Sequence, residues 1–173
     1  MTSEIRGLVS RSLHCLAEFE NLVSELYYRL SESSTDKIAR LSLSWISAES
    51  KQHSKYLSEL ASTLNLERDA SNCAEFIGVP WTTVENLFKD IGNTRSLSSK
   101  EVADTLKKLN IVENFAAEEV YSNVLIKQIR DVAALAGISI KVAEIIFSEI
   151  AEEERYHNEL VSALIKMLKK DFT

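Results

Sequence analysis

The chain has 173 residues, of which 45% are apolar, and its formal net charge is −6. This length fits one domain with a sizeable core, and 4 glycines and 1 proline are too few turn residues for a β-sandwich, a barrel or a glycine-rich phosphate loop. The acidic balance argues against a nucleic-acid partner, and the chain lacks the apolar run of about 18 residues that would predict a membrane-spanning helix.

The first two predicted elements are long helices joined by a short link. A helix over about 3–31 carries one stripe at steps of three and four residues, formed by Leu13, Leu16, Glu20, Val23, Tyr27 and Leu30. It ends in the polar segment 31–36, whose side chains favour local hydrogen bonds over a helix interior. A second helix over about 36–64 is expected to turn Ile46, Tyr56, Leu57 and Leu60 inward.

A long connection over about 65–98 follows the second helix. It is predicted to contain a short helix over about 83–91, which starts at a capping box formed by Thr82 and Glu85. Gly92 supplies the residue that commonly ends such a helix.

Two further long helices complete the predicted set. The third, over about 99–133, starts at a capping box formed by Ser98 and Glu101 and ends before Gly137. The fourth, over about 139–170, has an apolar stripe formed by Phe147, Ile150, Val161, Leu164 and Leu168. Short links make each helix pair an antiparallel hairpin, so we expect an all-α antiparallel four-helix bundle with one long crossover, as a single domain over 1–173. An irregular helical domain is the alternative.

The two cysteines, Cys15 and Cys73, form no CxxC motif, which excludes a four-cysteine metal site within the chain. Such sparse cysteine usage fits a reducing compartment, and we expect a cytoplasmic protein. A disulfide between the two cysteines remains open.

The two halves of the chain share a repeat. Two motif pairs carry it: ENLVSELYY (20–28) with ENFAAEEVY (113–121), and ISAESKQH (46–53) with IAEEERYH (150–157). The repeat matches Glu20 with Glu113 and His53 with His157. Each half therefore contains a helix with a glutamate, a turn, and a helix with a glutamate and a histidine.

These repeated residues fall on apolar helix stripes. Glu20 follows the stripe of the first helix, and His53, Glu154 and His157 follow the stripes of theirs. Ionisable groups in an apolar seam are costly unless they are paired or bind a metal. Their distances from the two short links place them at one height in the bundle, where carboxylates and imidazoles suit iron, manganese or zinc. A buried ion pair without metal is the alternative.

On these motifs, the chain resembles the ferritin-like di-iron proteins, and most of all the rubrerythrin branch, over roughly residues 5–168. The resemblance implies a ferritin-like bundle with two iron ions, for which manganese or zinc could substitute. The implied metal ligands are Glu20, Glu49, His53, Glu113, Glu154 and His157, with Glu20 and Glu113 as terminal ligands and Glu154 as a bridge. Ser50 stands where the family pattern has a glutamate, so Glu49, four residues before His53, is the candidate in its place.

Residues around the implied ligands carry two further expectations. Tyr28 and Tyr121 are expected to be core aromatics whose hydroxyls could contact ligand carboxylates. Glu152 and Glu153 are expected to face solvent.

The resemblance implies oxidation of ferrous iron with hydrogen peroxide or dioxygen, in peroxide detoxification or iron handling. A rubredoxin-like four-cysteine domain is missing from this sequence, so a separate protein would donate electrons, and a homodimer is expected. Two alternatives remain. One is a degenerate ferritin-like bundle without redox activity that serves in oligomerisation or partner binding. The other is a di-iron oxidase or hydroxylase of an organic substrate.

Overall fold

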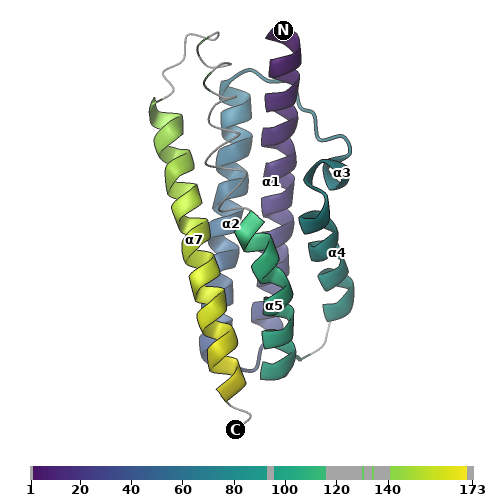
Figure 1. The fold of residues 1–173 in the computed structure, drawn as a ribbon, viewed down its shortest axis with the longest axis vertical. Coiled ribbons are helices and arrows are strands. Elements are labelled where there is room, and N and C mark those ends of the chain that lie inside the picture. Colours follow the sequence, from purple (N-terminus) through teal and green to yellow (C-terminus); the bar gives the residue numbers. More distant parts are fainter. Residues whose placement is uncertain (1, 93–95, 116–129, 131–133, 135–140, 171–173) are drawn as a thin grey trace.

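The computed structural model describes residues 2–92, 96–115, 130, 134 and 141–170, and over these residues the chain is a helical bundle (Figure 1). Four of its helices run along the long axis: α1 (Thr2–Ser33), α2 (Lys37–Thr63), α5 (Ser99–Phe115) and α7 (Lys141–Lys170). Two shorter helices, α3 (Cys73–Ile77) and α4 (Val79–Ile91), pack against α1. Regular structure in the described ranges is helical apart from one isolated β-bridge between Ser34 and Leu97, which confirms the all-α class.

The pairing of α1 with α2 sets the height of the candidate site. Asp36 caps α2 by accepting a hydrogen bond from the Ala39 backbone N–H at 2.7 Å. Between the helices, the Ser24 hydroxyl donates to the Ser47 carbonyl at 2.8 Å, and the Ser47 hydroxyl donates to the Ser24 carbonyl at 2.9 Å. Residues of α1 and α2 that are equally distant from the link between these helices therefore face each other. This register brings Glu20 of α1 to the height of His53 of α2, as the sequence predicted.

The predicted apolar stripes form the core. The buried members are Leu13, Leu16, Val23, Tyr27, Leu30, Ile46, Leu57, Phe147, Ile150, Val161, Leu164 and Leu168. Leu60, also predicted to face inward, is half-buried against this core. Tyr56 is 41% exposed, so its predicted inward orientation is wrong. The stripe of α1 also buries Glu20, at 3% exposure, as the periodicity predicted.

The crossover differs from the prediction at its centre. Helix α4 begins at Val79, four residues earlier than expected, because Pro80 lacks a backbone N–H and is tolerated in the first turn of a helix. Thr82 is consequently not a cap, and its hydroxyl donates to the Val79 carbonyl at 3.0 Å. Helix α3 was not predicted. Gly92, with φ 64°, follows α4 as expected.

The capping box before α5 is confirmed. The Ser98 backbone N–H donates to the Glu101 carboxylate at 3.0 Å, and the Glu101 backbone N–H donates to the Ser98 hydroxyl at 3.4 Å. The adjacent Leu97 backbone N–H donates to the Ser33 carbonyl at 2.8 Å, which holds the end of the crossover against the end of α1. The predicted continuation of this helix to residue 133, its end at Gly137 and the start of the fourth helix at 139 lie outside the described residues.

Cys15 of α1 and Cys73 of α3 form a disulfide across a sequence separation of 58. The bridge fastens the start of the crossover to the middle of the bundle, and Arg11 adds a hydrogen bond to the Ser71 carbonyl at 3.1 Å. A disulfide is not typical of proteins in a reducing compartment. The few cysteines of this chain therefore no longer support a cytoplasmic location, which stays a prediction. None of the described helices has the length and apolar content needed to cross a membrane.

Candidate metal centre

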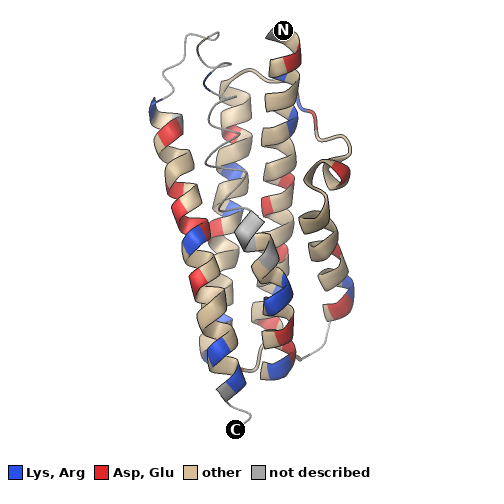
Figure 2. Cartoon of the chain, in the orientation of Figure 1, with Lys and Arg blue, Asp and Glu red and all other residues tan. Residues whose placement is uncertain are grey.

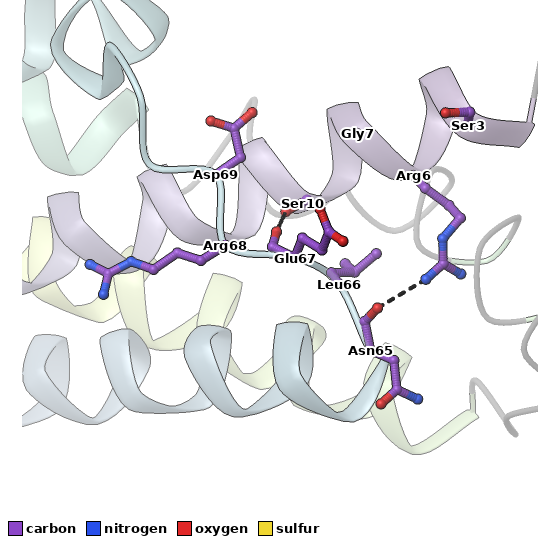
Figure 3. A pocket seen from close by; sticks show the side chains of 9 residues that line it. All are labelled: Ser3, Arg6, Gly7, Ser10, Asn65, Leu66, Glu67, Arg68 and Asp69. Atoms are coloured by element: carbon purple, nitrogen blue, oxygen red, sulfur yellow. Dashed lines mark hydrogen bonds between the residues drawn. The ribbon is translucent and has the colours of Figure 1, made fainter.

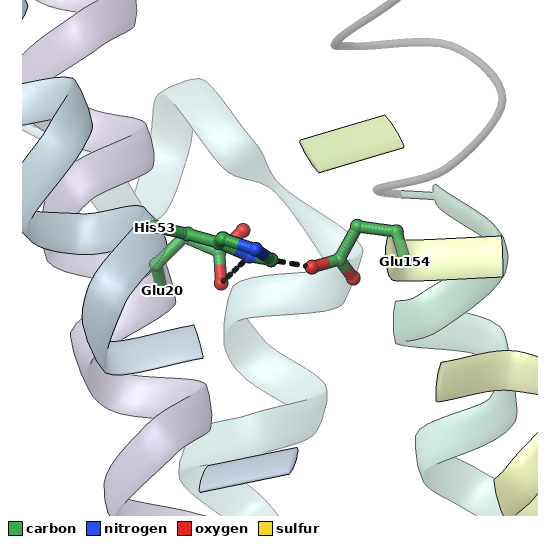
Figure 4. Close-up of side chains that lie close together, drawn as sticks. All are labelled: Glu20, His53 and Glu154. Atoms are coloured by element: carbon green, nitrogen blue, oxygen red, sulfur yellow. Dashed lines mark ion pairs between the residues drawn. The ribbon is translucent and has the colours of Figure 1, made fainter. Parts of the chain in front are cut away.

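Three buried ionisable side chains from three helices meet in the middle of the bundle (Figure 4). Glu20 comes from α1, His53 from α2 and Glu154 from α7, and their exposures are 3%, 1% and 3%. One potential ligand atom from each residue lies within 4.8 Å of the other two. The convergence expected from both halves of the chain is therefore present for these three residues.

The inner nitrogen of His53 faces both carboxylates. Its Nδ1 atom lies 2.9 Å from Glu154 Oε1 and 3.8 Å from Glu20 Oε2. Within the described part of the chain, neither His53 Nδ1 nor Glu154 Oε1 has a partner in hydrogen-bond geometry. A lone pair on Nδ1 beside a carboxylate oxygen requires a cation between them, which is either a proton or a metal ion.

His157 approaches the same carboxylate from the other side. It is fully buried on α7, one turn after Glu154, and its Nδ1 lies 3.5 Å from Glu154 Oε1. The centroids of the two imidazole rings are 6.0 Å apart, and the ring of Trp45 lies perpendicular to His157 with its centroid 5.8 Å away. Glu154 thus lies between two histidines that both turn Nδ1 toward it.

The outer nitrogen of each histidine contacts a second carboxylate. His53 Nε2 donates to Glu153 at 2.7 Å, and His157 Nε2 donates to Glu49 at 3.0 Å. A carboxylate on one ring nitrogen keeps the proton there and leaves the other nitrogen free to bind a metal. The contacts are reciprocal, because Glu153 of α7 holds the histidine of α2 while Glu49 of α2 holds the histidine of α7.

Two sequence expectations change at this point. Glu49 was predicted as a metal ligand, but its carboxylate lies on the outer nitrogen of His157 and is not part of the Glu20–His53–Glu154 group. Residues 49 and 50 both share a helix face with His53, but they lie on opposite sides of it. Ser50 is 1% exposed, whereas the Glu49 side chain is 24% exposed and its carboxylate reaches the outer nitrogen of His157. Glu153 was expected to face solvent, yet its partly exposed carboxylate contacts His53. The repeat could have indicated this, since it matches Glu153 with Glu49.

Three other predicted residues are not part of the described centre. Tyr28 is 56% exposed, so its prediction as a core aromatic is wrong, and Tyr27 occupies the buried stripe instead. Glu113 lies on α5, but its side chain is outside the described residues. Tyr121 also lies outside them.

The charges in this centre depend on one another. Burial alone would lower the pKa of His53, but the adjacent carboxylates of Glu154 and Glu20 outweigh burial and raise that pKa to about 11. Burial would raise the pKa of Glu154, but its contacts with His157 and His53 outweigh burial and lower it. Without a metal, His53 therefore carries a proton between two carboxylates at neutral pH.

A metal ion must replace that proton, which predicts a pH dependence of binding. We expect the affinity for Mn²⁺ to rise about tenfold per pH unit between about pH 6 and 8, because each bound ion releases one proton from His53. The sign follows from the raised pKa of His53, since the site is protonated below that value. Titration calorimetry in buffers of different ionisation enthalpy measures the released proton, and binding independent of pH would contradict the prediction.

Two carboxylates and an imidazole form a donor set that suits divalent iron, manganese or zinc. The centre is buried, and acidic residues recur along α7, which supplies Glu154 (Figure 2). The donor atoms and the orientation of both histidines fit a bound cation.

A second candidate site is a pocket of about 620 Å³ between the start of α1 and residues 65–69 (Figure 3). Its two arginines are already engaged, because Arg6 donates to the Asn65 carbonyl at 3.0 Å and Arg68 donates to Glu18 at 2.6 Å. The residues that line it include none of the Glu20–His53–Glu154 group. We therefore assign it no function.

Comparison with known proteins finds no matching family model, curated protein or solved structure. The resemblance to ferritin-like proteins thus depends on the repeat and its residues alone. Its implications for fold family, metal content and activity are proposals.

Proposed function

We propose that the chain is a ferritin-like metalloprotein, with its long helices in an antiparallel four-helix bundle, that binds iron and oxidises ferrous iron with dioxygen or hydrogen peroxide. The observation that carries this proposal is the buried Glu20–His53–Glu154 group, with His157 turned toward the same carboxylate. Three helices each place an ionisable residue in a mostly apolar core, and such burial is costly unless the charges are paired or hold a metal ion.

Each residue of the centre has a defined part in this proposal. Glu20 and His53 would hold an ion from α1 and α2, while Glu154 would be shared with His157. Glu49 and Glu153 would fix the histidines by accepting from their outer nitrogens, as they do in the structure. Bound iron would supply the electrons for reduction of the oxidant. Burial of all four inner residues would keep bulk water from the reacting ions.

The proposal also includes an electron donor and a second copy of the chain. Electrons for further cycles would come from a donor outside these 173 residues, because their two cysteines cannot form a four-cysteine electron-transfer site. A homodimer is supported by an exposed apolar stripe on α2, formed by Ile38, Leu41 and Trp45 at steps of three and four residues. The cytoplasmic location is a prediction that the disulfide does not support.

The proposal is tested by adding Fe²⁺ to the metal-free protein under anaerobic conditions and then admitting dioxygen or peroxide. We expect the protein to bind iron and to oxidise several equivalents faster than buffer alone. A Glu20→Gln variant should lose this activity, because it removes a buried carboxylate from the centre. The matched control is Glu25→Gln, which removes an exposed carboxylate from the same helix and should behave as the unmodified chain.

Two results would contradict the proposal. If the protein binds no Fe²⁺ and its thermal stability does not change with Fe²⁺ or a chelator, the bundle without redox activity is the better reading. If iron binds but neither oxidant is consumed faster than in buffer, the protein is a metal-binding protein without the proposed oxidation.

A further inference from the structure

The two halves of the centre differ at one repeated position. The repeat matches Ser50 of α2 with Glu154 of α7, each three residues before a buried histidine. Ser50 is itself buried, at 1% exposure. Residues three apart share one helix face, so the position that supplies a carboxylate from α7 supplies only a hydroxyl from α2.

Glu154 is therefore the carboxylate that both histidines use. Its Oε1 lies 2.9 Å from His53 Nδ1 and 3.5 Å from His157 Nδ1. Paired metal ions in proteins lie about 3.5–4 Å apart and repel each other, so carboxylates between them hold the pair together. A carboxylate at position 50 would be the second such group, and this chain does not have it.

The charge balance leads to the same conclusion. Two divalent ions would bring four positive charges into a buried site, where uncompensated charge is costly. Among the residues that the structure describes, Glu20 and Glu154 supply two negative charges inside the centre. Glu49 and Glu153 are on the outer nitrogens and already accept hydrogen bonds there.

We propose that the centre binds its two ions unequally: one resident ion is held in the Glu20–His53–Glu154 group, and a second ion binds weakly beside His157 and exchanges with solvent. This inference rests on the proposed function, and within it the weakly held ion is the ferrous substrate. Ser50 is the residue that sets the difference, because a carboxylate there would share both ions.

The test is a titration of the metal-free protein with Mn²⁺, followed by equilibrium dialysis against buffer without metal. We expect about one ion per chain to remain, and a Ser50→Glu variant to retain about two, the number that ferritin-like centres with a full carboxylate set hold. Ser50→Gln is the matched control, since it has the same size as the glutamate variant without its charge, and it should retain the same number as the unmodified chain.

The outcomes separate the two proposals. An unmodified chain that binds no ion would overturn the proposed function and this inference together. Two ions of equal affinity in the unmodified chain would overturn only the unequal centre, and that measurement needs no variant to fold. A folded Ser50→Glu variant that still retains one ion would show that position 50 does not set the difference.

Discussion

Replacing Glu154 with glutamine is expected to weaken metal binding more than about 100-fold, because loss of a residue outside the ligand shell already costs 10- to 100-fold in comparable sites. Glu154 contacts the inner nitrogens of both His53 and His157, so the variant removes the one charge that both halves of the centre share. The side chain keeps its size, and we expect unchanged helical content by circular dichroism. Equilibrium dialysis with Mn²⁺ measures the affinity.

A matched control is available on the same helix. Glu149 is exposed on α7, and Glu149→Gln should bind Mn²⁺ as the unmodified chain does. If Glu154→Gln folds and binds with undiminished affinity, the ion is held elsewhere and the assigned centre is wrong. If both variants weaken binding equally, the effect is a general loss of negative charge, which also contradicts the assignment.

Loss of the Cys15–Cys73 disulfide is expected to lower the free energy of unfolding by about 4 kcal/mol. This magnitude follows from the loop of 58 residues that the bridge closes, since a longer closed loop removes more conformational freedom from the unfolded chain. Both cysteines are buried, and alanine removes one sulfur atom at either position, so the cavity it leaves adds little to the loss of the cross-link. Denaturant unfolding of Cys73→Ala, compared with the unmodified chain, measures the loss.

A reductant provides the control for this prediction. It should destabilise the unmodified chain by the same amount and leave Cys73→Ala unchanged. Two reactive thiols in the denatured, unreduced protein would show that the bridge does not form. In that case the connection between α2 and α4 would depend on packing alone, and the cysteines would again fit a reducing compartment.

Much of the bundle could be predicted from local patterns. Steps of three and four residues place Leu13, Glu20 and Tyr27 on one face whatever the helix packs against, and the structure buries all three. Capping at Ser98 depends on a residue three positions away, so it too is visible in the sequence. The start of α4 was missed because a proline in the first turn resembles a break in the chain.

The repeat predicted that Glu20, His53, Glu154 and His157 converge, but it did not predict their exact contacts. It matched Tyr28 with Tyr121, yet a residue eight positions after Glu20 lies about 80° from it around the helix, and Tyr28 is exposed. Glu49 of α2 contacts His157 of α7, and Glu153 of α7 contacts His53 of α2. These contacts between helices depend on how α2 and α7 approach each other. Neither helix contains that information alone.

The amino-acid order by itself determined the long helices, their buried faces and the acidic and histidine residues that those faces bury, because each depends on neighbours within a few positions. Only the tertiary structure decided which nitrogen of each histidine faces inward, which glutamates lie outside the centre and that the two cysteines are bonded. These features join residues from 58 to 108 positions apart, and their geometry is set by packing between helices.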